Sequence, residues 1–151
     1  MDGNGSLKLD ANKEKSWNVL LDPDVLERCI MGCKKLELVD ENTYHADLSV
    51  GIAAVKGQYT SIIKITNVEK PERYTLIVKG EGGPGNVEAT ANIELTEQDE
   101  QTTVLSYSYE AEVGGKVAMV GQRMLGGVAK LIIKDFFKKF AKELDKSEAH
   151  R

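Results

Sequence analysis

The sequence predicts an α+β fold in which a curved antiparallel sheet of about six or seven strands wraps around one long C-terminal helix. Two observations carry this prediction. Between residues 34 and 113, apolar and polar residues alternate with a period of two, which is typical of antiparallel strands with one buried face. From about Gly115 to Lys146, apolar residues instead recur every three or four positions, which indicates an amphipathic helix. This helix is the segment best suited to cover the apolar face of the sheet.

One short strand and two short helices are expected before the sheet. Residues 5–10 can form the strand, and Asn12 is a typical N-cap for the first helix. Pro23 suits the first position of the second helix, which Gly32 ends.

The strands that follow are separated by turns rich in Asp, Asn, Pro and Glu. The clearest alternation covers residues 44–50, 74–79, 87–95 and 104–113. A further strand is expected over residues 57–68, where the neighbouring Ile62 and Ile63 leave open which side chains face inward.

The composition is that of one soluble globular domain covering residues 1–151. The formal net charge of −4 argues against a general nucleic-acid-binding protein. The sequence has no leader-like start and no apolar run of membrane-spanning length, and its two cysteines fit a reducing compartment. We therefore expect a cytoplasmic protein.

The stretch KGEGGPGN contains the G-x-G-x-x-G spacing of a dinucleotide-binding turn at Gly80, Gly82 and Gly85. Such a turn must be followed by a helix, because the helix N-terminus contacts the phosphates. Here the alternating segment 87–95 follows instead, and Pro84 removes one backbone donor. The stretch is therefore expected to be a turn between two strands.

No motif indicates catalysis, a metal site or a cofactor. Cys29 and Cys33 are spaced C-x-x-x-C, one residue longer than the usual zinc or redox spacing, and the sequence has only two histidines as further ligands. His45 alternates with apolar residues on a strand and is expected to face solvent. No Ser, His and acidic residue occur together in the context of a known catalytic motif.

Charge is unevenly distributed along the chain. Residues 86–112 contain seven acidic residues and no Lys or Arg, whereas residues 116–146 contain eight basic and three acidic residues. A row of lysines repeats at every fourth position on the polar side of the expected helix: Lys130, Lys134, Lys138 and Lys142. The row can be a solvated face, or it can contact an anionic membrane or an acidic partner.

The segment that begins the long helix, residues 114–127, is rich in glycine and methionine. A glycine inside a helix costs about 1 kcal/mol relative to alanine, so a compensating role is expected. The five glycines of this segment, Gly126 and Gly127 among them, can allow close approach to the sheet. Alternatively, the segment leaves a gap for a ligand, with the flexible Met119 and Met124 near its mouth.

We expect a cavity of roughly 300 Å³ or more between the sheet and the helix, because small apolar-face residues leave volume that a packed core would fill. The expected lining residues of the sheet share the apolar phase of their strands: Leu48, Tyr59, Leu76, Val78, Ala89, Ala91, Tyr107 and Tyr109. The expected lining residues from the last segment are Met119, Val120, Met124, Leu125 and Val128.

Several segments together resemble the family of the carbon monoxide dehydrogenase G-subunit, within the superfamily of START-like lipid-transfer domains and polyketide cyclases. The resemblance covers about residues 5–144. It rests on LDPDVLERCIMGC at 21–33, GQY at 57–59, the glycines of 80–85, GGKVA running into GQR at 114–123, and the later pair Phe136 and Phe137. The resemblance implies a helix-grip fold, with an apolar cavity between the sheet and the long helix.

The resemblance also implies a function. Such domains bind hydrophobic small molecules, and this branch is associated with molybdenum hydroxylases of the carbon monoxide dehydrogenase type, as an accessory that helps couple them to the membrane. A lipid-like molecule, with a quinone favoured, is the ligand class implied. Two features depart from the family: Met31 stands where proline is usual, and the chain stops at Arg151 without the long tail of many relatives. We therefore expect a soluble carrier with at most transient, peripheral membrane contact.

Three classes of function follow from these observations. A non-catalytic carrier for a hydrophobic small molecule is expected first, because no catalytic set is recognisable. The alternative is an assembly or membrane-recruitment adaptor for the molybdenum enzyme that transports no ligand. The third is an enzyme of the polyketide cyclase or hydrolase type, since a fold alone does not determine chemistry.

Overall fold

The computed structural model describes residues 1–149 of the chain, with side chains up to Lys146. The strands are β1 (Asp2–Leu9), β2 (Cys33–Asp40), β3 (Thr43–Val50), β4 (Gly57–Glu69), β5 (Arg73–Gly82), β6 (Gly85–Asp99) and β7 (Thr102–Gly114). The α-helices are α1 (Lys13–Leu20), α2 (Pro23–Cys29) and α3 (Gln122–Ala149), and two short 3₁₀ helices are η1 (Ala53–Val55) and η2 (Lys116–Val120).

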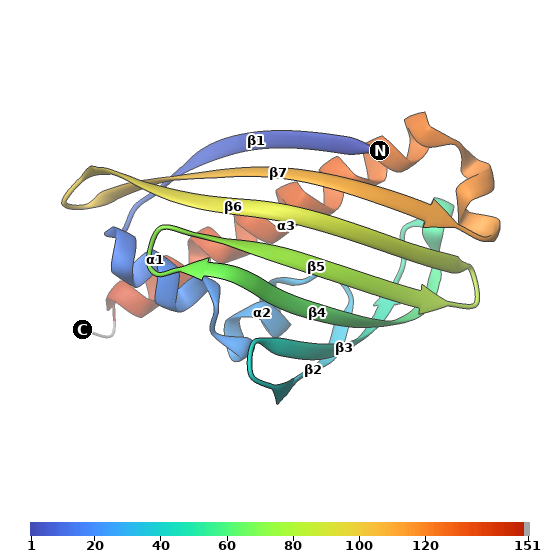
Figure 1. Cartoon of the computed structure of the whole chain (residues 1–151), viewed down its shortest axis with the longest axis horizontal. Coiled ribbons are helices and arrows are strands. Elements are labelled where there is room, and N and C mark those ends of the chain that lie inside the picture. Colours follow the sequence, from blue (N-terminus) through green and yellow to red (C-terminus); the bar gives the residue numbers. More distant parts are fainter. Residues whose placement is uncertain (150–151) are drawn as a thin grey trace.

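The strands form one seven-stranded antiparallel sheet in the order β1-β7-β6-β5-β4-β3-β2. The long helix α3 crosses behind this sheet, from the η2 end to the end that carries α1 and α2 (Figure 1). This confirms the predicted α+β class, with a sheet that wraps around the C-terminal helix and two short helices after the first strand.

The two short helices begin where the sequence predicts. The Asn12 side chain accepts a 2.8 Å hydrogen bond from the backbone N–H of Lys15, and Pro23 is the first residue of α2. The side chain of Asp22 caps α2 by accepting from the N–H of Asp24 at 2.9 Å. These caps satisfy N–H groups that lack partners at a helix start, which fixes both boundaries.

The long helix begins later than the predicted Gly115. Residues Lys116–Val120 form η2, and Gly121 separates η2 from α3 with a backbone φ of 93°. A side chain disfavours this left-handed region, so the glycine makes the break possible. The predicted continuous helix from 115 is therefore wrong, and α3 starts at Gln122.

The KGEGGPGN stretch is a hairpin turn, as predicted. Gly82 and Gly85 pair across the ends of β5 and β6, so the connecting residues are Gly83 and Pro84. A side-chain carbon on Gly85 would lie 2.3 Å from the carbonyl oxygen of Gly114. The glycine at this position thus serves the close packing of the hairpin against β7 and not phosphate binding.

The hydrophobic core lies at the end of the molecule that carries α1 and α2. The α3 side chains Phe140 and Leu144 are fully buried there, together with Leu105 of β7. Trp17 of α1 contacts Tyr74 of β5 edge to face, with ring centroids 5.3 Å apart. The C-terminal half of α3 is therefore anchored in a packed core, whereas its N-terminal half lies over a different part of the sheet.

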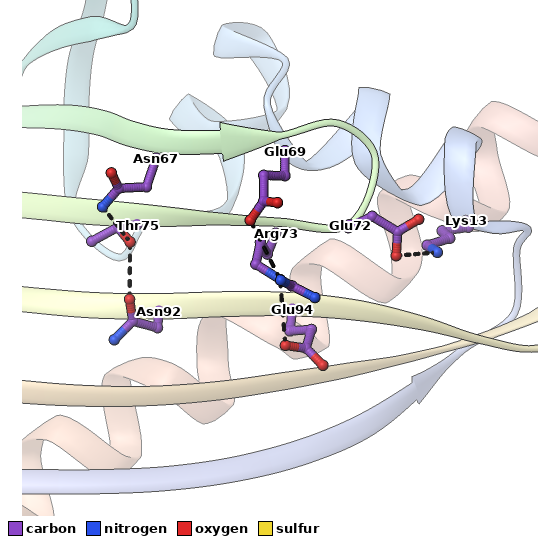
Figure 2. Close-up of polar contacts among 8 residues, drawn as sticks. All are labelled: Lys13, Asn67, Glu69, Glu72, Arg73, Thr75, Asn92 and Glu94. Atoms are coloured by element: carbon purple, nitrogen blue, oxygen red, sulfur yellow. Dashed lines mark hydrogen bonds and ion pairs between the residues drawn. The ribbon is translucent and has the colours of Figure 1, made fainter.

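Polar contacts cover the outer face of the sheet. Arg73 lies between Glu69 and Glu94, and Thr75 donates a hydrogen bond to Asn92 (Figure 2). Arg73 lies 3.4 Å from the carboxylate of Glu69 and 3.6 Å from that of Glu94, and the Thr75–Asn92 hydrogen bond is 2.9 Å long. Further along this face, two pairs of carboxylates are direct cross-strand neighbours: Asp2 with Glu110, and Glu88 with Glu112. The part of this face formed by β6 and β7 is acidic, in contrast to the lysine-rich outer side of α3.

An apolar cavity as the candidate functional site

A cavity of about 340 Å³ lies between the inner face of the sheet and the N-terminal half of α3. Strands β3 to β7 form its wall on one side, and Leu125, Val128, Ala129, Ile132 and Ile133 close it from the helix. Small residues on neighbouring strands leave the volume open, including Ser61, Gly80, Ala89 and Ala111. The volume lies within the range of small-molecule sites, at its lower end.

Many of the residues predicted from strand and helix phase line this cavity. They are Leu48, Tyr59, Val78, Ala89, Tyr109, Leu125 and Val128. The register also decides the phase of β4: Tyr59, Ser61 and Ile63 point inward, and Ile62 is 46% exposed on the outer face.

Three predicted lining residues of the sheet lie outside the cavity wall. Leu76 and Tyr107 pack against the hydrophobic core instead, and the Tyr107 ring lies 5.5 Å from the ring of Phe137. Ala91 sits between Leu76 and Tyr109 on adjacent strands, at the boundary of core and cavity. These residues share the apolar face of their strands, but Leu76 and Tyr107 lie against the core, to which α3 contributes Phe136, Phe137 and Phe140.

Three predicted residues from residues 114–127 lie on the outer surface. Met119 is 86% exposed, Met124 is 53% exposed and Val120 is also exposed. The break at Gly121 turns η2 away from the helix axis, so the phase of Met119 and Val120 differs from that of a continuous helix. Met124 belongs to α3 and lies on the outer side of this helix, one position before the cavity-lining Leu125. These side chains therefore do not close the cavity, and Val117 of η2 lines it instead.

The glycines near the start of α3 do not serve close packing. A side-chain carbon placed on Gly126 or Gly127 would meet no atom within 4 Å. Gly127 is exposed and Gly126 is half-buried, and the residues of this turn that line the cavity are Leu125, Val128 and Ala129. Close approach to the sheet therefore does not explain these two glycines, but it does explain Gly115 of the same segment, where a side-chain carbon would lie 2.7 Å from the Cα of Gly85.

One end of the cavity is closed by η1, η2 and the β5–β6 hairpin. The Tyr59 hydroxyl donates a 2.6 Å hydrogen bond to the carbonyl of Val55 in η1. The N–H of Val117 donates to the carbonyl of Pro84 at 2.8 Å. Val55 and Val117 were not predicted as lining residues, because Val55 lies outside the periodic segments and Val117 lies in the segment that was predicted to belong to the continuous long helix; a valine close to a glycine was the available signal.

The chemistry of the cavity is apolar. Among the described residues that line it, none has a charged side chain, and the polar ones are Tyr59, Ser61, Asn86 and Tyr109. Burial raises the pKa of both tyrosines, so their phenols stay neutral at physiological pH. The wall is thus suited to an uncharged, hydrophobic group.

The cysteines and histidine give no second site within residues 1–149. Cys29 is buried, which raises the pKa of its thiol to about 11, and Cys33 is half-buried. His45 lies on β3 opposite Ile62, on the outer face of the sheet. No cluster of three metal-ligating side chains occurs in this part of the chain.

The lysine row lies on the outer side of α3, as its spacing predicts. Lys130, Lys134, Lys138 and Lys142 are all exposed. Beside them, α3 and Val120 form a shallow surface hollow with an apolar floor and one cation, lined by Val120, Arg123, Met124, Gly127, Val128 and Leu131. None of the described helices combines the length and hydropathy that spanning a bilayer requires.

Comparison with known proteins agrees with this architecture. A conserved protein from Geobacillus kaustophilus superposes with a TM-score of 0.95 at 57% identity over 97% of each chain. A START superfamily protein from Mycobacterium smegmatis has a TM-score of 0.78 at 10% identity, over 96% of this chain and 97% of that one. TTHA0849 from Thermus thermophilus has a TM-score of 0.72 at 9% identity, over 97% and 99%. The distant matches show the START-like helix-grip fold.

No curated protein matches the chain. The sequence profile of the carbon monoxide dehydrogenase G-subunit (CoxG) matches residues 5–145, which is nearly the whole chain and includes every element that builds the cavity. On this match, the chain belongs to the CoxG family of the carbon monoxide dehydrogenase G-subunit.

Proposed function

We propose that this protein is a non-catalytic binding protein that carries a hydrophobic small molecule in the cavity between its sheet and α3. The single observation that carries the proposal is the 340 Å³ volume, whose described lining residues have no charged side chain. Burying apolar ligand surface there is favourable by about 25 cal/mol per Å². The titratable side chains among these lining residues are two neutral tyrosines, which are poorly suited to acid–base chemistry near pH 7.

The finer part of the proposal concerns the ligand and the partner. On the resemblance described above, we propose a lipid-like ligand, with a quinone as the favoured class, and a partner enzyme of the carbon monoxide dehydrogenase type with a molybdenum centre; the match to the family supports the choice of this enzyme type. The protein would then take up its ligand at the inner face of the cell membrane and act in the cytoplasm. The proposed function involves no cofactor and no nucleic acid.

A substitution that fills the cavity tests ligand binding. Ala89 lines the cavity, whereas its neighbour Thr90 is exposed on the outer face of the same strand. We expect the neutral fluorophore N-phenyl-1-naphthylamine to bind the wild-type protein and the Thr90→Leu control equally. Ala89→Leu should bind it at least tenfold more weakly, because the added side chain occupies the ligand volume. Equal binding by all three proteins would mean that the fluorophore binds outside the cavity, and this result would contradict the proposal.

A second candidate, a recruitment adaptor, is favoured by the exposed apolar side chains near the start of α3. Met119, Met124 and Leu131 are each at least half exposed, and Arg123 and the lysine row lie beside them. Exposed apolar groups rimmed by cations are typical of surfaces that contact a partner or a membrane. An adaptor should keep its association with the membrane or the partner when Ala89→Leu fills the cavity. Met124→Ser/Leu131→Ser should weaken that association, because it removes the exposed apolar groups.

A further inference from the structure

A second hollow, of about 280 Å³, lies directly beside the cavity, between the edge strand β1 and α3. Tyr109 and Ile133 line both spaces, so these two side chains form the partition between them. The outer hollow, here termed the β1–α3 groove, also contains Tyr107, Lys130 and Lys134. The cavity is apolar, whereas the adjoining groove is polar along one side.

The tyrosine rings reach the groove because β1 has glycines beneath them. Gly3 pairs with Tyr109 and Gly5 pairs with Tyr107 across the β1–β7 ladder. A side-chain carbon on Gly3 would lie 2.6 Å from the Tyr109 hydroxyl oxygen, and one on Gly5 would lie 2.5 Å from the Tyr107 hydroxyl oxygen. The two rings therefore extend from β7 across β1. Their hydroxyl groups lie over β1, the edge strand that borders the groove.

The lysines of the groove are available to a ligand. Lys130 and Lys134 are exposed and form no ion pair with an acidic side chain within the described residues. This differs from Lys139 on the same helix, which pairs with Asp135 at 2.8 Å. Ammonium groups are obligate hydrogen-bond donors, and phenol hydroxyls are donors as well. The groove thus offers several donors next to an apolar space.

We infer that the β1–α3 groove binds the polar head of the ligand whose apolar part occupies the cavity. The ligand class is an amphiphile with a head that presents oxygen acceptors, either a carboxylate or the carbonyls of a quinone ring. Lys130, Lys134 and the Tyr107 and Tyr109 hydroxyls donate to those oxygens, and the chain passes the partition formed by Tyr109 and Ile133. This inference rests on the proposed function, since a head site requires a ligand in the cavity.

Two lysine pairs of the same row allow a matched test. Lys130 and Lys134 line the groove, whereas Lys138 and Lys142 continue the row outside it. Decanoate and a decyl-substituted benzoquinone are titrated as competitors of N-phenyl-1-naphthylamine, which has no oxygen acceptor. In Lys130→Gln/Lys134→Gln we expect the acceptor-bearing ligands to compete about fivefold more weakly, because a partly exposed ionic contact contributes a binding free energy of about this size. The Lys138→Gln/Lys142→Gln control should compete as the wild type does, and the fluorophore itself should bind all three proteins equally.

The two competitors identify the head. A loss for decanoate alone supports a carboxylate head, and a loss for the quinone supports carbonyl recognition, with a further loss in Tyr109→Phe expected for either. Equal losses in the two lysine pairs would assign the effect to general surface charge and overturn the head site. Unchanged competition in every variant, with the fluorophore still bound, would overturn it as well and leave the proposed function intact. If neither fluorophore nor competitors bind the wild type, the proposed function fails and the head site with it.

Discussion

Arg28 on α2 donates two hydrogen bonds to a single carboxylate oxygen of Glu143 on α3, from Nε at 3.0 Å and from Nη2 at 2.7 Å. The contact joins residues 115 positions apart in the sequence and ties α2 to the half of α3 that carries the core. The hydrogen bonds from Arg28 hold the pKa of Glu143 below its ordinary value, and Lys146 adds to the effect.

The stability of the protein should depend on pH through this contact. A carboxyl group with a lowered pKa stabilises the fold above its unfolded pKa, and this contribution is lost as the pH falls through the lowered folded value. Glu143→Gln should therefore be less stable than the wild type at pH 7, by about 0.5–1 kcal/mol because Arg28 is largely exposed. In urea unfolding, the difference should shrink as the pH falls below the ordinary carboxyl pKa of 4.5 and vanish below the lowered value. Glu37→Gln, in the exposed pair with Lys35, is the control and should change little. A deficit that persists in acid would exclude the charge as its source.

Alanine at Gly126 and Gly127 of α3 should stabilise the protein. Gly126 and Gly127 have free space where a side-chain carbon would lie, and alanine is favoured over glycine in helices by about 1 kcal/mol. For a domain of this size, each substitution should raise the melting temperature by about 2–4 °C. Gly85→Ala is the contrasting variant and should lower it, because its side-chain carbon would overlap the Gly114 carbonyl. A lower melting temperature for Gly126→Ala would mean that this turn of α3 is packed.

The core half of α3 should be far more sensitive to truncation than its outer surface. Phe140 is fully buried and stacks on Phe136 with centroids 6.1 Å apart. Phe140→Ala should cost about 3–5 kcal/mol in the free energy of unfolding, from lost burial and the cavity left behind. Leu131→Ala, at a position 50% exposed, should stay within about 0.5 kcal/mol of the wild type. Denaturant titration of both variants measures the contrast.

Membrane contact should depend on the lysine row beyond the groove. Each basic residue near an anionic bilayer contributes about 1 kcal/mol, so Lys138→Glu/Lys142→Glu should weaken binding to anionic liposomes by about 2 kcal/mol or more. The wild-type binding should itself be weak and should fall with added salt. Lys64→Glu/Lys79→Glu reverses two exposed charges on the outer face of the sheet and should leave binding unchanged. Equal sedimentation with neutral and anionic liposomes would show that the row is only a solvated face.

The sequence contains most of the information on the fold, because strand phase and helix periodicity are local properties. Alternation was sufficient to assign the inner face of β5, and the N-cap Asn12 and the N1 residue Pro23 mark helix starts that the structure confirms. The phase of β4 was ambiguous at Ile62 and Ile63, and only pairing with β3 and β5 resolves it.

The sequence contains less information on the site, because lining depends on where α3 lies along the curved sheet. Leu76 and Val78 share one face of β5, yet Leu76 packs on the core and Val78 lines the cavity. The break at Gly121 could not be distinguished from a flexible helical glycine, and it places Met119 outside and Val117 inside. The β1–α3 groove was not predicted, because its two walls come from segments that are distant in the sequence.

The division of α3 into a core half and a cavity half implies a gradient of local stability along one helix. Backbone amides near Phe140 should exchange with solvent only on global unfolding, whereas those between Leu125 and Ala129 should exchange through local opening, because fewer packed side chains hold that turn. Opening of this turn would expose the cavity while the opposite end stays folded. The C-terminal half of α3 would thus hold the helix in the core, while local opening of its N-terminal turns would control access to the cavity.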